Sequence, residues 1–225
     1  MLAADRPVAR LWFALCMIVV ALALALQIPI TAADETLFFT TPAGRVANLF
    51  TYFTILSNLL VGVTSAVLAL RPSADSTLLW VARFDAVLGV TITAVVHHVL
   101  LAPLFHFEGT EWVADQLFHT VSPLLVVAGW LLFGPRGRVS ARIVGLALLY
   151  PVAWLAFTLV RGAIIGWYPY PFINVLVLGY PRVALNCLGI TALFLVLATA
   201  FVGLDRLLDR PPRARRAPSG ASIEA

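Results

Sequence analysis

Three polar side chains that lie in apolar stretches have the residue types that acyl transfer requires. Asp115 precedes His119 by four residues, so the two share one face of a helix. A carboxylate in that position accepts the imidazole N–H, fixes the tautomer and raises the basicity of the ring. Thr54 offers a hydroxyl, which is a poor nucleophile unless a base assists it. These residues predict a nucleophile, a base and an orienting acid.

Hydropathy determines which elements position them. Of the 225 residues 61% are hydrophobic and 12% are charged, and the mean hydropathy is +0.97, which excludes a soluble globule. Six runs are near the length of about 20 apolar residues that a bilayer crossing needs. They cover residues 11–28, 46–70, 79–104, 112–133, 143–166 and 183–204. We therefore predict an all-α, polytopic membrane protein with one domain of six transmembrane helices over residues 1–205, and a basic, disordered tail over 206–225.

Arginine placement predicts the orientation. With both termini in the cytoplasm, all of the 15 arginines except Arg45, Arg161 and Arg182 lie on the inner side, as the positive-inside rule requires. An alternative treats the first helix as a cleaved signal peptide, which leaves five helices in the same orientation. The absence of lysine and the richness in alanine, leucine and valine are typical of GC-rich bacterial genes. This composition favours a multi-pass protein of a bacterial inner membrane.

Polar residues on several predicted helices fall at one depth. At 1.5 Å per residue, Thr54, His98 and His119 each lie about 9–12 Å below the outer surface. Arg161 and Asn186 lie at a similar or shallower level, and Asn58 shares a helix face with Thr54. Polar groups in hydrocarbon are costly and are often functional. We therefore expect a polar site that opens outward.

Structural roles for these residues stay open. Membrane threonines, Thr51 among them, commonly bond the preceding helical turn. Arg161 is also placed to snorkel toward headgroups, and His97 to face another side of the helix than His98. Arg83 and Asp85 are interpreted as a local interfacial pair, and Pro123 predicts a distortion beside His119.

Other ligands receive no support from the sequence. No spacing of histidines or of Cys16 and Cys187 predicts a metal site, a disulfide or a cofactor. The basic tail is interpreted as a topology signal near anionic lipid, not as a nucleic-acid arm. The expected partners are therefore membrane lipids.

Several strings in the chain resemble one known family. FTYFTILSN, HHVLLAP, ADQLFHTVSPLL, GWLLFGPR, LVRGAIIGWYPYPF and RVALNC span about residues 47 to 190. In that order they are similar to the bacterial six-helix branch of the androgen-induced integral membrane protein superfamily. Eukaryotic members are threonine hydrolases that cleave fatty acid esters of hydroxy fatty acids.

This resemblance implies roles for particular residues. The family's threonine falls on Thr54, with Thr51 as the fallback, and its histidine falls on His119. The chain departs from the family pattern where paired histidines are replaced around Gly162 and Ala163, and where the proline follows His119 one residue early.

The resulting hypothesis is an intramembrane hydrolase of a lipid or fatty acid ester that acts from the outer half of the bilayer. Its catalytic residues are Thr54, Asp115 and His119. The residues expected to bind substrate or the oxyanion are Asn58, His98, Arg161, Tyr170 and Asn186. The alternatives are a small-solute or proton-coupled transporter and a non-catalytic lipid-binding protein.

Overall fold

The protein is built from helices. The computed structural model describes residues 7–134 and 136–209, and that part of the chain contains no strand. Its α-helices are α1 (Pro7–Ala33), α2 (Pro42–Leu49), α3 (Phe53–Leu70), α4 (Thr77–Val96), α5 (Gly109–Gln116), α6 (Ser122–Phe133), α7 (Ala141–Ala147), α8 (Leu149–Ile165) and α9 (Val175–Leu208). Two π-helical turns, η2 (His97–Leu101) and η4 (Leu117–Val121), and two 3₁₀ turns, η3 (Ala102–Leu104) and η5 (Pro171–Ile173), join them.

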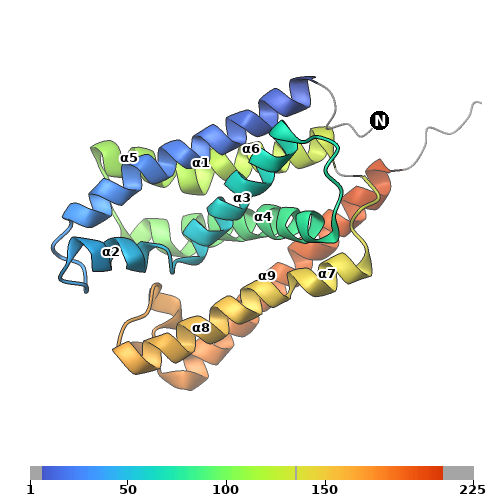
Figure 1. Ribbon diagram of the computed structural model, residues 1–225. Coiled ribbons are helices and arrows are strands. Elements are labelled where there is room, and N and C mark those ends of the chain that lie inside the picture. Colours follow the sequence, from blue (N-terminus) through green and yellow to red (C-terminus); the bar gives the residue numbers. More distant parts are fainter. Residues whose placement is uncertain (1–6, 135, 210–225) are drawn as a thin grey trace, which may run out of the picture.

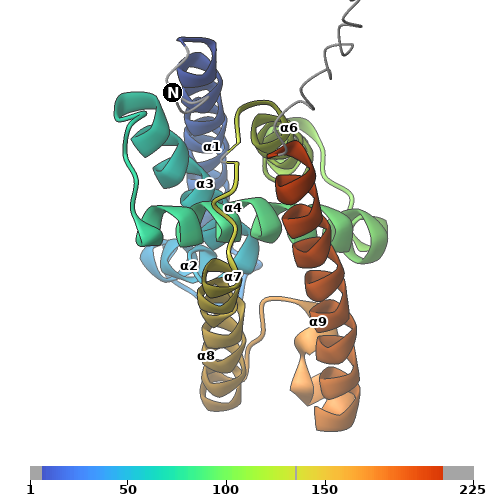
Figure 2. The same ribbon diagram turned by 90° about the vertical axis from the view of Figure 1, so that its right-hand side faces the viewer.

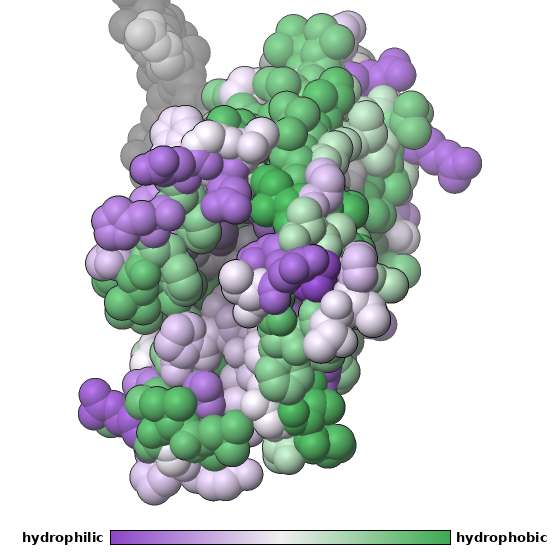
Figure 3. Space-filling view, turned by 90° about the vertical axis from the view of Figure 1, so that its left-hand side faces the viewer, coloured by the Kyte–Doolittle hydropathy of each residue, from purple (hydrophilic) through white to green (hydrophobic). Residues whose placement is uncertain are grey.

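Six helical stretches are long and apolar enough to cross a membrane. They run Pro7–Ala33, Phe53–Leu70, Thr77–Leu104, Gly109–Phe133, Ala141–Ile165 and Val175–Leu208. The start of α1 and the end of α9 lie at the same end of the bundle (Figures 1 and 2). The opposite end, which carries α2, is called the α2 end below, and it shows hydrophilic residues among apolar ones (Figure 3). The all-α class and the six membrane-spanning helices are confirmed, and the orientation stays a prediction.

The second predicted span is not one helix. Residues 46–70 divide between α2 and α3, which run in different directions (Figure 1). The hydroxyl of Thr51 donates to the carbonyl of Asn48 at 2.7 Å, and Tyr52 has extended backbone angles. A local side-chain bond of this kind competes with the helical ladder. The break therefore places Thr54 in the first turn of α3.

The last span also begins earlier than predicted. Helix α9 starts at Val175 instead of residue 183 and is kinked at Gly179, whose φ of +71° only glycine adopts easily. The helix continues to Leu208, so the first residues of the predicted tail are helical, not disordered. Residues 210–225 of that tail lie outside the described part of the chain.

Helix α4 runs through the centre of the bundle. Phe84, Val87, Leu88 and Val90 are each fully buried, as expected of a helix that is apolar on every side. Gly89 lets α3 approach closely, because a Cβ there would lie 2.5 Å from the Ser57 hydroxyl. Helices α8 and α9 flank this core and turn large apolar side chains outward. Those faces suit contact with lipid.

Arg83 and Asp85 do not pair with each other. The two side chains point to different sides of α4, because they are two residues apart. Arg83 is fully buried, donates to the Ser65 hydroxyl at 3.4 Å and lies 5.2 Å from the centre of the Phe13 ring. The Oδ1 atom of Asp85 has no hydrogen-bond partner among the described residues. The predicted interfacial pair is therefore wrong.

Candidate functional site

Two π-helical turns carry the histidines of the candidate site. His97 is the first residue of η2, where its carbonyl accepts the N–H of Ala102. His119 is the central residue of η4, which closes when the N–H of Ser122 reaches the carbonyl of Leu117. The distortion predicted from Pro123 is thus present as a π turn. Such turns insert one residue into a helix and are frequent at functional sites.

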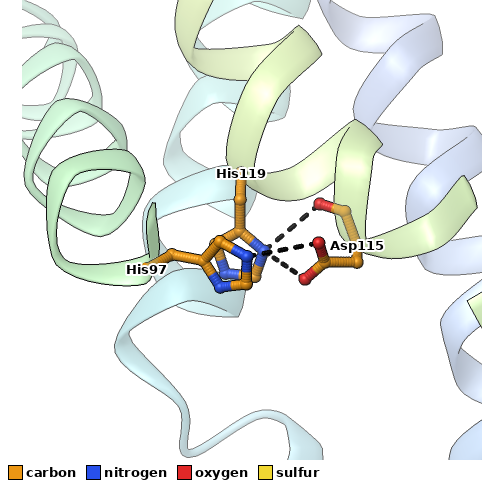
Figure 4. A group of neighbouring side chains, drawn as sticks. All are labelled: His97, Asp115 and His119. Carbon is orange, nitrogen blue, oxygen red and sulfur yellow. Dashed lines mark hydrogen bonds and ion pairs between the residues drawn. The ribbon is translucent and has the colours of Figure 1, made fainter. Parts of the chain in front are cut away.

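Asp115 bridges two histidines on different helices (Figure 4). Its Oδ1 lies 2.9 Å from His119 Nδ1, and its Oδ2 lies 3.2 Å from His97 Nε2. The two imidazole rings stack, with centroids 3.8 Å apart and planes 9° from parallel. The side chains of His97, Asp115 and His119 are 6%, 10% and 16% exposed. The carboxylate is therefore held by two N–H donors in a largely buried place.

This arrangement selects the tautomer of His119. A carboxylate only accepts hydrogen bonds, so the bond to Asp115 keeps a proton on Nδ1 of His119. The same nitrogen also contacts the Asp115 carbonyl at 3.2 Å. Nε2 is left with a free lone pair, which is the form that a general base requires. The contact predicted from the four-residue spacing is present.

The neighbouring pair His97 and His98 divides in an unexpected way. His98 is exposed, and its Nδ1 lies 2.8 Å from the Ala94 carbonyl while its Nε2 lies 3.3 Å from the Thr120 hydroxyl. His97, which the sequence pattern treats as facing elsewhere, is the residue that reaches Asp115. Only one of two consecutive helical residues can face a given neighbour. Hydropathy does not identify which one does.

Thr54 lies on the wall of an apolar cavity and is bonded to Tyr170. The Tyr170 hydroxyl accepts the backbone N–H of Thr54 at 3.3 Å and lies 3.3 Å from Thr54 Oγ1. The cavity has a volume of about 150 Å³, and its other walls include Thr93, Trp154 and Phe194. Burial raises the pKa of Tyr170, which keeps the phenol protonated and able to donate. The Thr54 side chain therefore lines the cavity, and the Tyr170 hydroxyl beside it can donate a hydrogen bond.

Thr51, the fallback nucleophile, is engaged elsewhere. Its hydroxyl donates to the carbonyl of Asn48, and its own carbonyl accepts the indole N–H of Trp154 at 2.9 Å. These bonds shape the break between α2 and α3. Thr51 is absent from the residues that line the cavity, so the geometry favours Thr54.

Asn58 ties the Thr54 helix to the His119 turn. Its amide nitrogen donates to the Thr54 carbonyl at 3.0 Å and to the Phe118 carbonyl at 3.4 Å. Because one nitrogen atom bonds both, the carbonyl oxygens of Thr54 and Phe118 lie close together. The Oδ1 atom of Asn58 is buried and has no partner among the described residues. The amide nitrogen of Asn58 is thus engaged, whereas its oxygen is an unused acceptor that does not line the cavity.

Direct contact between the predicted nucleophile and base is absent. Within residues 7–134 and 136–209, no hydrogen bond joins Thr54 to His119, and His119 does not line the cavity. Val96, the residue before His97, does line it. Free enzymes often hold such pairs apart until substrate binds. The link that the structure shows between the Thr54 helix and the His119 turn is the Asn58 amide.

The remaining predicted binding residues do not converge on Thr54. Arg161 donates to Asn48 Oδ1 at 2.8 Å, and its guanidinium lies 5.4 Å from the ring centres of Phe39 and Trp167. Asn186 donates to the Phe172 carbonyl at 2.8 Å. Of the five residues expected to bind substrate or oxyanion, only Tyr170 contacts the Thr54 side chain.

A metal ion suits the histidine cluster poorly. The ligand atoms of His97, Asp115 and His119 lie within 4.8 Å of one another, which is close enough to share an ion. An imidazole binds a metal in its own plane at about 2.0–2.1 Å. Two parallel rings whose centroids are 3.8 Å apart have no common in-plane point, so one ring would have to turn. The arrangement fits a carboxylate shared by two imidazoles instead.

Comparison with known proteins adds no assignment to this site. No protein-family model, curated protein or solved structure matches the chain. The likeness to the androgen-induced superfamily therefore stays a prediction.

Proposed function

We propose that the protein is an intramembrane hydrolase of lipid esters. Thr54 is the nucleophile, His119 is the general base, and Asp115 orients the base. The observation that carries this proposal is the pair of hydrogen bonds that the Asn58 amide nitrogen donates to the carbonyls of Thr54 and Phe118. These bonds support the proposal because they join the backbone of Thr54, whose side chain lines the cavity, to the turn that carries the Asp115-bonded imidazole.

The proposed reaction requires Thr54 and His119 to come into hydrogen-bond contact when the substrate binds. Nε2 of His119 takes the hydroxyl proton while Thr54 Oγ1 attacks the acyl carbonyl carbon, and the carbonyl π electrons move to the oxygen. Collapse of this intermediate breaks the ester C–O bond, and the departing alcohol takes the proton from His119. A water molecule, deprotonated by the same imidazole, then attacks the acyl carbon, the bond from that carbon to Thr54 Oγ1 breaks, and Oγ1 takes the proton back from His119 as the fatty acid leaves. The chain ends in its starting state.

Charge on the oxyanion needs a donor near Thr54. The Tyr170 hydroxyl is suitable, since it lies 3.3 Å from Thr54 Oγ1 and stays protonated. A fixed donor at a developing charge is typically a major contribution to catalysis.

The membrane setting defines the substrate class. The cavity walls are mostly apolar, and the helices around them are membrane spans, so the ligand is a lipid ester. With the orientation predicted from the arginines, the α2 end faces outward in a bacterial inner membrane. The substrate then comes from the outer half of the bilayer.

Labelling with a fluorophosphonate probe tests the proposal. The purified protein in lipid nanodiscs should be labelled, and Thr54→Ala should abolish the labelling. Thr51→Ala is the matched control, because it removes a threonine hydroxyl three residues away that is bonded to Asn48. Labelling of Thr54→Ala at the parent rate would overturn the assignment of the nucleophile.

A proton-coupled transporter is the second candidate. The observation that favours it is the carboxylate that bridges two histidines inside membrane-spanning helices, because such groups also form proton relays. In proteoliposomes, proton-driven flux that needs His119 and persists in Thr54→Ala would favour transport. Absence of such flux, together with Thr54-dependent labelling, supports the hydrolase.

A further inference from the structure

A second apolar recess lies between the end of α4 with η2 and helix α9. It is a groove of about 580 Å³, lined from one side by residues such as Leu100 and from the other by residues such as Leu193. Val99 and Leu104, which also line it, are 66% and 60% exposed. Because these helices span the membrane, the mouth of the groove faces lipid.

A glycine of α9 lies on the groove wall. Gly189 is on the groove wall, and a Cβ atom there would meet no other atom within 4 Å. A side chain at this position would therefore project into open space. Helix α9 also has Gly203, which has equally free surroundings but does not line the groove. The two glycines offer a matched pair on one helix.

The groove adjoins the cavity at Thr54. Four residues line both spaces, namely Val96, Leu101, Phe172 and Ile190. The path from the bilayer to the Thr54 hydroxyl is thus walled by apolar side chains. Asn186 is the polar residue of the groove lining, and its amide nitrogen already donates to the Phe172 carbonyl. In the cavity, Thr191 is also polar, and its hydroxyl already donates to the Cys187 carbonyl. A polar headgroup would find few partners along this path.

We propose that the groove binds a long, unbranched acyl chain, which enters sideways from the bilayer between η2 and α9. This inference rests on the proposed function, because it names the acyl half of the ester that Thr54 attacks. The ester carbonyl lies at Thr54, and the hydrocarbon tail runs past Phe172 and Ile190 into the groove. Burial of each methylene favours the bound state by a factor of about four.

Filling the groove should change chain-length preference. In Gly189→Trp the indole occupies the path of the tail, so two or three methylenes lose their contacts. The kcat/KM for 4-nitrophenyl palmitate should fall about tenfold or more. The kcat/KM for 4-nitrophenyl acetate, whose acyl group ends at the cavity, should stay unchanged. Gly203→Trp should change neither value.

A second variant protects the test against misfolding. Leu100→Trp fills the groove from the opposite wall and should lower the palmitate-to-acetate ratio as Gly189→Trp does. Size-exclusion chromatography in detergent identifies which variants are folded. Parent-like ratios in both folded variants would overturn the proposal.

A binding assay separates this proposal from the hydrolase itself. A palmitic acid that carries a diazirine should label groove residues of the Thr54→Ala protein, and Gly189→Trp should remove that labelling. Labelling without hydrolysis of any ester would refute the proposed function and support the acyl groove. Hydrolysis of palmitate esters without groove labelling would do the reverse.

A second copy of the chain is the competing occupant of the groove. It would give disulfide-linked dimers of Gly189→Cys in native membranes. If such dimers form and Leu100→Trp leaves the palmitate-to-acetate ratio of kcat/KM unchanged, the groove is an interface between two copies of the chain and not an acyl-chain site.

Discussion

Replacement of Asp115 by asparagine isolates the orienting role of the carboxylate. The variant keeps the side-chain shape but has one acceptor oxygen where the carboxylate has two. In the parent protein, Asp115 accepts hydrogen bonds from His119 at 2.9 Å and from His97 at 3.2 Å. The asparagine oxygen can serve one ring only, and its NH₂ group must face the other. At least one imidazole then changes its tautomer or loses its partner.

The size of the effect follows from the role of the base. A positioned acid or base contributes about 10²- to 10⁴-fold to a rate, and the wrong tautomer removes most of that. Asp115→Asn should therefore slow fluorophosphonate labelling of Thr54 by about 10²-fold or more. Glu111→Gln is the control, because it makes the same chemical change at an exposed position of α5. The rate is measured by gel fluorescence over time.

One result would refute this reasoning. If folded Asp115→Asn protein labels Thr54 at the rate of Glu111→Gln, the carboxylate does not orient the base. The bridge in Figure 4 would then be a structural link between α4 and α5.

Three further predictions concern packing and metal. Gly162→Ala should destabilise the fold by about 1–3 kcal/mol, because an added Cβ would clash with the Tyr168 ring. Gly145→Ala is the control and should not lower Tm, because an added Cβ there would meet no atom within 4 Å. Equal Tm values for the two variants would contradict the predicted clash. Arg83→Met should leave Tm unchanged or raise it, because a buried charge without a carboxylate partner is costly, and a large loss of stability would show that Arg83 has an acidic partner. EDTA should leave the labelling rate unchanged, and a loss restored by Zn²⁺ would place a metal at the histidine cluster.

Much of the fold is predictable from hydropathy, because each span must be long and apolar. The break between α2 and α3 is not predictable in this way, because it depends on the Thr51 hydroxyl, which donates to the Asn48 carbonyl instead of binding water or a ligand. The early start of α9 also escapes hydropathy. Gly179 and Pro181 interrupt the apolar run in sequence, although the helix resumes after one residue with positive φ.

In the site too, contacts within one helix are predictable from the sequence, whereas contacts between helices are not. The Asp115–His119 contact follows from helical spacing alone and is present. The choice of His97 over His98 depends on a π turn and on the packing of α4 against η4 and α6, which the spacing of residues in one sequence does not reveal. Tyr170 is recognisable as a candidate, but its bond to Thr54 needs the loop before α9 to fold back over α3.

Identification of the labelled residue tests the central claim most directly. After reaction with the fluorophosphonate, the protein is digested and the modified peptide is sequenced by mass spectrometry. We expect one phosphonate adduct, on the oxygen of Thr54, that disappears in Thr54→Ala and forms slowly in Asp115→Asn. An adduct on another residue, with Thr54 unmodified, would contradict it.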